Sequence, residues 1–109
     1  MILATTSSLE NKIIKEYRGI VFGEVICGID FIKDFTASIT NFAGGRAEEY
    51  EEELVNARAD AVNEMIERAK KIGANALVGV KIDVESINFG EKNGVMLMVV
   101  ATGTAVVTE

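Results

Sequence analysis

The chain has 109 residues, of which 49% are apolar and 26% charged, and 17 acidic against 11 basic side chains give a formal charge of -6. A chain of this length fits one domain, here residues 1–109, and its negative charge argues against nucleic acid or an anionic membrane surface as a partner. No apolar run approaches the ~20 residues that would cross a bilayer.

Several absences bear on the cellular location that we expect. The opening Met1-Ile2-Leu3-Ala4 lacks the basic start of a signal peptide. A single cysteine, Cys27, cannot form an intrachain disulfide, and this fits a reducing compartment. We therefore expect a cytoplasmic protein.

The first forty residues are short segments separated by glycine. Residues 1–6 are predicted as a brief strand, and residues 7–11 as a polar turn. Residues 12–28 are rich in β-branched and aromatic side chains and predict two strand pieces, with a bend or bulge at Gly19 and Gly23. A short helix should follow, capped by Asp30, with one apolar face formed by Phe31, Phe35, Ile39 and Phe42.

Residues 47–72 carry the strongest local pattern. Apolar side chains recur there at steps of three and four, which predicts a long amphipathic helix with one stripe made of Tyr50, Leu54, Ala57, Ala61, Met65, Ala69 and Ile72. Glutamates fill the first turns, basic residues the last turn, and Gly73 supplies a left-handed stop. Charge and cap therefore agree on where this helix begins and ends.

The last third of the chain predicts a hairpin. Residues 77–87 alternate, so that Val80, Ile82 and Val84 share one face and charged residues share the other. After a loop at residues 88–94, residues 95–107 are apolar on both faces. The fold class is therefore α+β, a small antiparallel sheet packed against one long and one short helix.

The lengths of these elements favour self-association. The long helix would span ~39 Å and the last strand ~43 Å, whereas a compact chain of this size has a radius of gyration near ~13 Å. Two helices can cover one face of the sheet, so the second apolar face of residues 95–107 needs another subunit.

The absence of histidine excludes Ser-His-Asp and Cys-His catalysis and histidine metal motifs. Cys27 stands among apolar neighbours, which favours a core or interface residue over a reactive thiolate. A symmetric oligomer could still gather several copies of Cys27 around a divalent or heavy-metal ion. The acidic run at 48–53 could hold a hard cation, although acidic residues are ordinary at a helix start.

Gly44-Gly45-Arg46 directly precede the long helix. Exposed amides, a helix N-terminus and a guanidinium can together bind an anion, although a turn at a subunit contact is favoured. Asp34 could pair with Asp30 as two carboxylates on one helix face, but capping and solvation account for both.

The whole set of motifs resembles the YbjQ-like family. The matching residues cover almost the whole chain and include Thr5-Thr6, the segment 19–28, Asp34-Phe35, Gly44-Gly45-Arg46 followed by Tyr50-Glu51, residues 73–80, and Gly103-Thr104-Ala105-Val106. The resemblance implies a dodecin-like subunit in a ring pentamer. The family is labelled as heavy-metal-binding, a label that does not identify ligands.

The sequence departs from the family pattern at two places. Thr40-Asn41 stand where an Arg-Asp pair is frequent, and Lys33 stands where an arginine is common. Dodecins stack flavin on tryptophan, and this chain has no tryptophan, so we expect no flavin. The candidate ligand-binding residues are Gly44, Gly45, Arg46, Asp34 and Tyr50, and the candidate metal ligand is Cys27.

Three hypotheses follow. The first is a non-enzymatic homo-oligomer, pentameric by resemblance, that binds a small ligand of unknown identity. The second is a metal-binding protein that uses Cys27 or clustered carboxylates repeated by symmetry. The third is an enzyme with a site between subunits, in which Arg46 binds an anionic substrate and Asp34 or Glu51 acts as acid or base.

Overall fold

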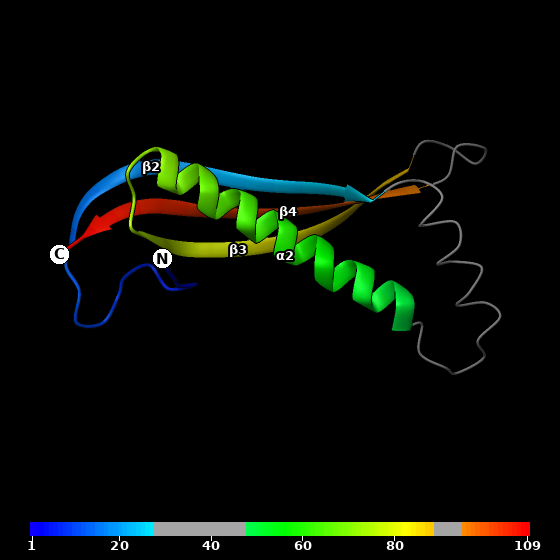
Figure 1. Ribbon diagram of the computed structural model, residues 1–109, viewed down its shortest axis with the longest axis horizontal. Coiled ribbons are helices and arrows are strands. Elements are labelled where there is room, and N and C mark those ends of the chain that lie inside the picture. The colour runs from blue at the N-terminus through cyan, green and yellow to red at the C-terminus, as the bar shows by residue number, and fades with distance from the viewer. Residues whose placement is uncertain (28–47, 89–94) are drawn as a thin grey trace.

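A computed structural model describes residues 1–27, 48–88 and 95–109. These form a four-stranded sheet with strand order β1-β3-β4-β2, and helix α2 lies across one face of it (Figure 1). The elements are β1 (Ile2–Leu3), β2 (Ile14–Cys27), α2 (Glu48–Lys71), β3 (Ala76–Asn88) and β4 (Val95–Thr108). The predicted α+β class, long helix and hairpin are confirmed, whereas the short helix predicted after Asp30 lies outside the described residues.

Strand β4 is the centre of the sheet. It runs antiparallel to both β2 and β3, while β1 runs parallel to β3 through the pairs Ile2–Ala76 and Leu3–Leu77. The sheet is therefore mixed rather than wholly antiparallel. The bulge at Gly79, with φ of 60°, shapes the edge where the N-terminal segment binds, because the Gly79 amide donates to the Thr6 carbonyl at 2.8 Å.

Strand β2 is one continuous strand of 14 residues, where the sequence predicted two pieces. The expected irregularity is present at Gly19, which has φ of 123° and follows a shift of register after Tyr17. Gly23 does not interrupt the strand. It lies directly beneath α2, and its missing side chain makes room for the helix backbone.

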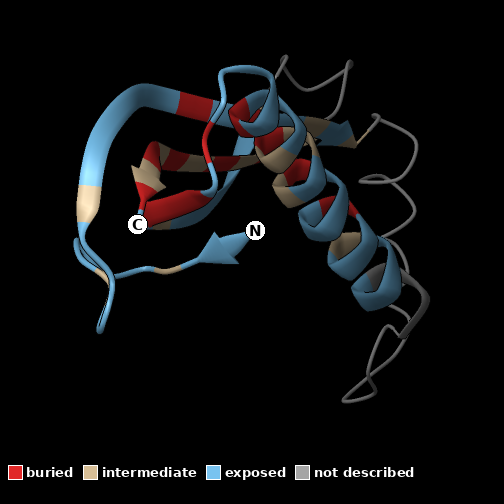
Figure 2. Ribbon diagram, turned by 60° about the vertical axis from the view of Figure 1, so that its left-hand side comes forward, coloured by how far each residue is buried: buried red, intermediate tan, exposed pale blue. Residues whose placement is uncertain are grey.

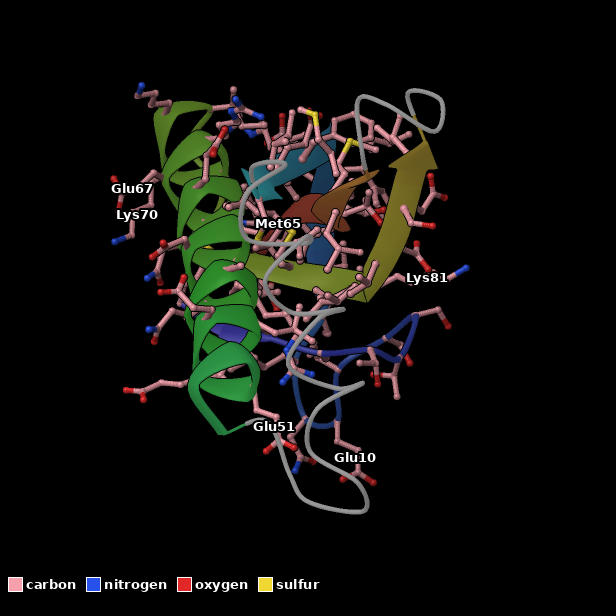
Figure 3. All side chains as sticks on the ribbon, turned by 90° about the vertical axis from the view of Figure 1, so that its right-hand side faces the viewer. Glu10, Glu51, Met65, Glu67, Lys70 and Lys81 are labelled. Carbon is pink, nitrogen blue, oxygen red and sulfur yellow. The ribbon has the colours of Figure 1, made fainter. Side chains whose placement is uncertain are left out.

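Helix α2 buries a narrow stripe of mostly small side chains against the sheet, which allows a close approach. Ala57, Ala61, Met65 and Ala69 are all buried there (Figure 2). Gly103 of β4 leaves room for Met65, since a Cβ on Gly103 would lie 3.4 Å from the Met65 sulfur. Figure 3 shows Met65 pointing from the helix toward the strands.

The C-terminal end of α2 is closed as the sequence predicted. Gly73 has φ of 81°, its amide donates to the Lys70 carbonyl at 3.0 Å, and the Ala74 amide donates to the Ala69 carbonyl at 3.1 Å. These two bonds form a Schellman motif. Glycine adopts the left-handed backbone conformation that this motif requires without steric strain.

One arginine of α2 fastens the helix to the edge of the sheet. Arg68 donates from Nη1 to the carbonyl oxygen of Phe22 at 2.8 Å and forms an ion pair with Glu64 one turn earlier. The C-terminal half of the helix therefore lies over β2. The whole helix crosses the sheet obliquely (Figure 1) and packs more extensively on β2 and β4 than on β3.

The molecule is elongated. Its radius of gyration is 17.3 Å and its extents are 53 × 27 × 18 Å, whereas a compact chain of this length would have a radius near ~13 Å. Within the described ranges, no helix is both long and apolar enough to span a membrane.

Candidate functional site

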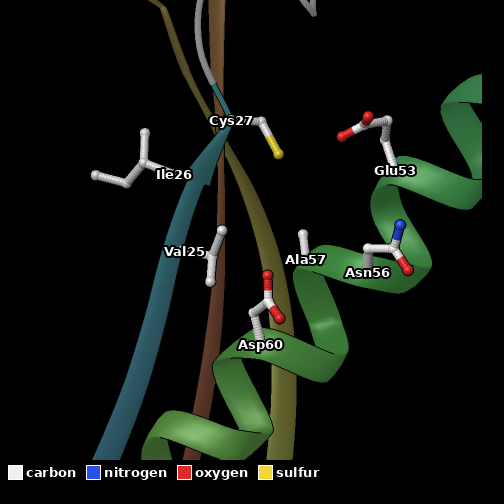
Figure 4. A pocket seen from close by; sticks show the side chains of 7 residues that line it. All are labelled: Val25, Ile26, Cys27, Glu53, Asn56, Ala57 and Asp60. Atoms are coloured by element: carbon white, nitrogen blue, oxygen red, sulfur yellow. The ribbon is translucent and has the colours of Figure 1, made fainter.

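A hollow of about 280 Å³ lies between the end of β2 and the first half of α2. Its lining combines apolar walls with one thiol, two carboxylates and one amide (Figure 4), from Val25, Ile26, Cys27, Glu53, Asn56, Ala57 and Asp60. We call it the Cys27 hollow.

Two periodicities assemble this hollow. Strand alternation places Cys27 on the same face as Val25, toward the helix, while the Ile26 side chain points away (Figure 4). On α2, Glu53, Asn56 and Asp60 are three and four residues apart and therefore lie on one side of the helix, facing β2.

The electrostatics of the hollow keep the thiol protonated. Burial of the Cys27 side chain, and then the negative charge of Glu53, raise the pKa of the thiol above its ordinary value. A thiol with a raised pKa carries little thiolate at neutral pH, and thiolate is the nucleophilic and metal-binding form. The site does not favour a nucleophilic cysteine, and a metal ion would have to displace a proton.

The donor set of one chain does not complete a metal site. In the part of the chain that the structure describes, no three Cys, Asp or Glu side chains are grouped closely enough to hold a metal ion. A zinc ion in a structural site takes four ligands, commonly including thiolates. Any heavy-metal site that uses Cys27 must therefore draw ligands from elsewhere.

The structure places only part of the predicted site. Cys27 lines the hollow, and Tyr50 lies in the first turn of α2, where its side chain is outside the described residues. Asp34 and the segment 44–46 also lie outside the described residues, so their proposed roles stay predictions. Sequence reasoning did not connect Cys27 with Glu53, Asn56 and Asp60, although the three-and-four spacing on the helix was the available signal.

A second feature is the sheet face that α2 does not cover. The β2 side chains that alternate with the buried Val21 and Gly23 point to this face, and the large apolar ones are exposed by 69% at Ile20, 44% at Phe22 and 56% at Ile26. We call this the outer face of β2. It continues onto β4, where Met98 and Val100 pair with β2 residues and are half-buried.

The comparisons with known proteins match this chain along its full length. Residues 1–109 match the sequence profile of the family described as "Putative heavy-metal-binding". The chain belongs to the YbjQ-like family. This YbjQ-like chain is 58% identical to a UPF0145 protein of Acetivibrio thermocellus and 59% identical to one of Clostridium botulinum strain Eklund 17B, over 100% of both chains in each case.

A further relative and one solved structure are also similar to this chain. A UPF0145 protein of Listeria monocytogenes is 57% identical to the YbjQ-like chain over 100% of this chain and 96% of the relative. The crystal structure of a protein of unknown function in the DUF74 family, from Pediococcus pentosaceus, gives a TM-score of 0.61 at 13% identity and covers 100% of this chain and 98% of that one. That structural similarity supports the fold alone.

Proposed function

We propose that this YbjQ-like protein is a self-assembling binding module, whose copies associate through the outer face of β2 and bind a small ligand near the contacts between them. The exposure of Ile20, Phe22 and Ile26 on one face carries the proposal. Burying large apolar side chains yields ~1.5 to 3 kcal/mol each, so such a stripe favours association.

The shape of the chain supports assembly as well. The radius of gyration of 17.3 Å exceeds the ~13 Å of a compact chain of this length, so the subunit exposes more surface than a globular one and has more to bury on assembly. The family resemblance motivates a ring of five, with Gly44, Gly45 and Arg46 at or near a subunit boundary. A ring brings identical sites together around one axis, which suits a ligand that needs more groups than one chain offers.

Native mass spectrometry of the purified protein tests this proposal, because it reports stoichiometry and retained ligand together. We expect a mass that is a multiple of the 11.8 kDa of one chain.

Ile20→Glu and Phe22→Glu should shift the protein toward monomer while circular dichroism stays unchanged, because both side chains are already exposed. Lys81→Glu is the matched control, since Lys81 points away from α2 on the same sheet face but adds no apolar contact (Figure 3). A wild-type monomer at micromolar concentration would contradict the proposal.

The Cys27 hollow favours a second candidate function, heavy-metal binding by copies of Cys27 brought together in the oligomer. The supporting observation is that a thiol and the Glu53 carboxylate line one accessible hollow. Elemental analysis and titration with zinc or copper(I), repeated on Cys27→Ser, would test it. We expect the apparent affinity to rise with pH, because the thiol must lose its proton before it coordinates. Equal metal content in wild type and Cys27→Ser would exclude Cys27 as a ligand.

A further inference from the structure

A second exposed apolar surface lies on the other side of the sheet. Ile82 and Val84 of β3 pair with Ala101 and Val99 of β4, which are fully buried beneath α2. Paired residues share a face of the sheet, so Ile82 and Val84 also face the helix side. They are nevertheless 43% and 45% exposed, because α2 packs mainly on β2 and β4.

Helix α2 extends this surface. Val55 is 52% exposed, and Val62 and Ile66 are half-buried. Val62 follows Val55 by seven positions and Ile66 follows Val62 by four, so the three side chains share one side of the helix. Asp60, two positions before Val62, lies about 200° away around the helix and lines the Cys27 hollow beside β2. The apolar side of α2 thus faces away from β2, and with Ile82 and Val84 it forms what we call the helix–β3 surface.

The two apolar surfaces cannot both be buried by a two-fold contact of one surface with itself. The outer face of β2 and the helix–β3 surface lie on opposite faces of the sheet, toward opposite edges. A two-fold contact joins a surface to its own copy and leaves the other surface exposed. A heterologous contact, repeated from copy to copy, covers both.

Single charges within the two surfaces are complementary. Glu24 lies between Phe22 and Ile26 on the outer face of β2, and Arg58 lies between Val55 and Val62 on α2. Both side chains are exposed, and neither forms an ion pair with any residue in the ranges the structure describes. An acidic group within one apolar stripe and a basic group within the other fix how two copies meet.

We propose that the outer face of β2 in one copy packs on the helix–β3 surface of the next copy, with Glu24 of one copy paired to Arg58 of the other. This contact rests on the self-assembly proposed above and names the residues that make it. Because it is heterologous, it generates a closed ring or, if the rotation does not close, an open filament.

A charge swap tests this pairing. We expect Glu24→Arg and Arg58→Glu each to raise the concentration at which the oligomer half-dissociates by about tenfold or more, because each places like charges across the contact. The double variant Glu24→Arg/Arg58→Glu restores opposite charges and should recover most of that loss. Glu10→Arg is the control, since it reverses an exposed charge in the turn before β2, outside both surfaces.

The outcomes separate this inference from the proposed function. Wild-type protein that is monomeric overturns both. Wild-type protein that is oligomeric, with single reversals that have no effect or a double variant as weak as the sum of the singles, overturns the Glu24–Arg58 contact and leaves self-assembly standing. If a reversal prevents folding by circular dichroism, Glu24→Gln and Arg58→Gln replace it, and additive losses in their double variant would then contradict the pairing.

Discussion

Gly23 of β2 lies so close beneath Ala61 of α2 that a methyl group on Gly23 would overlap the Ala61 carbonyl oxygen and stand 2.8 Å from the Met65 nitrogen. The neighbouring atoms belong to a helix backbone and cannot rotate away as a side chain would. This contact sets how closely helix and sheet approach.

Gly23→Ala should therefore destabilise the protein strongly. We expect a loss of at least ~3 kcal/mol, at the upper end for overpacking, because α2 must move away from its buried stripe. Urea unfolding monitored by circular dichroism measures this loss of unfolding free energy, with Lys81→Ala as an exposed control on the same sheet. A Gly23→Ala midpoint equal to that of the control would show that the helix can shift at no cost.

Met65 offers a test of the core itself. Its side chain is fully buried between α2 and Gly103. Met65→Ala should cost ~2 to 5 kcal/mol, the range for large-to-small core substitutions that leave a cavity. Glu67→Ala, on the exposed side of the same helix, should have little effect. Similar melting temperatures for the two variants would mean that the core collapses around the missing side chain.

The end of the hairpin depends on one amide side chain. Asn75 Oδ1 accepts from the Thr108 backbone amide at 2.9 Å, and Asn75 Nδ2 donates to the Thr108 carbonyl at 3.2 Å. The Thr108 hydroxyl also donates to Oδ1 at 3.3 Å. Removing all three bonds in Asn75→Ala should cost ~1 to 3 kcal/mol, because these polar groups are partly buried. Asn63→Ala is the control at an exposed site on α2. Hydrogen exchange should show faster exchange of the Thr108 amide in Asn75→Ala, and unchanged exchange there would argue against this role.

The Cys27 thiol should react slowly with iodoacetamide. Burial and Glu53 raise the pKa of the thiol, so at pH 8 less thiolate is present than in a free cysteine. Glu53→Gln should increase the rate, and Glu52→Gln, which changes a neighbouring charge outside the hollow, should not. A wild-type rate equal to that of a small thiol would contradict the raised pKa.

The same shift fixes the sign of a pH effect on stability. Because the pKa is higher in the folded state, the folded protein holds its proton where the unfolded chain has lost it. The stability that the protonated Cys27 thiol contributes is fully present below the pKa of the thiol in the unfolded chain. It is lost as the pH rises through the higher pKa of the thiol in the folded protein. Cys27→Ser should therefore lose less stability than wild type between pH 8 and pH 10, and parallel profiles would contradict the linkage.

Local patterns predicted much of the fold. The bounds of α2 agree with the prediction to within one residue, because the glutamates at its start and Gly73 at its end are local signals. The alternation of β3 and the doubly apolar β4 also follow from single-strand patterns. Gly23 was misread as a bend because its role is tertiary: it accommodates a helix that begins about 25 residues later in the sequence.

The Cys27 hollow could not be predicted from local sequence patterns, because the residues that line it come from β2 and α2, which are distant in the sequence. Glu53 reaches Cys27 because α2 crosses β2 at the position that Gly23 permits, and Arg68 holds it there. Sequence spacing places Glu53 and Asp60 on one side of a helix, but it does not say which strand that side meets.

Arg68 also has a protective consequence. Among the strands that the structure describes, β2 is a long edge strand rich in β-branched and aromatic residues, the kind of edge to which other strands can add. By occupying the outward carbonyl of Phe22, the guanidinium takes the hydrogen bond that an incoming strand would need midway along this edge. The bond that fastens the helix therefore also makes the addition of another strand less favourable at this point of the edge.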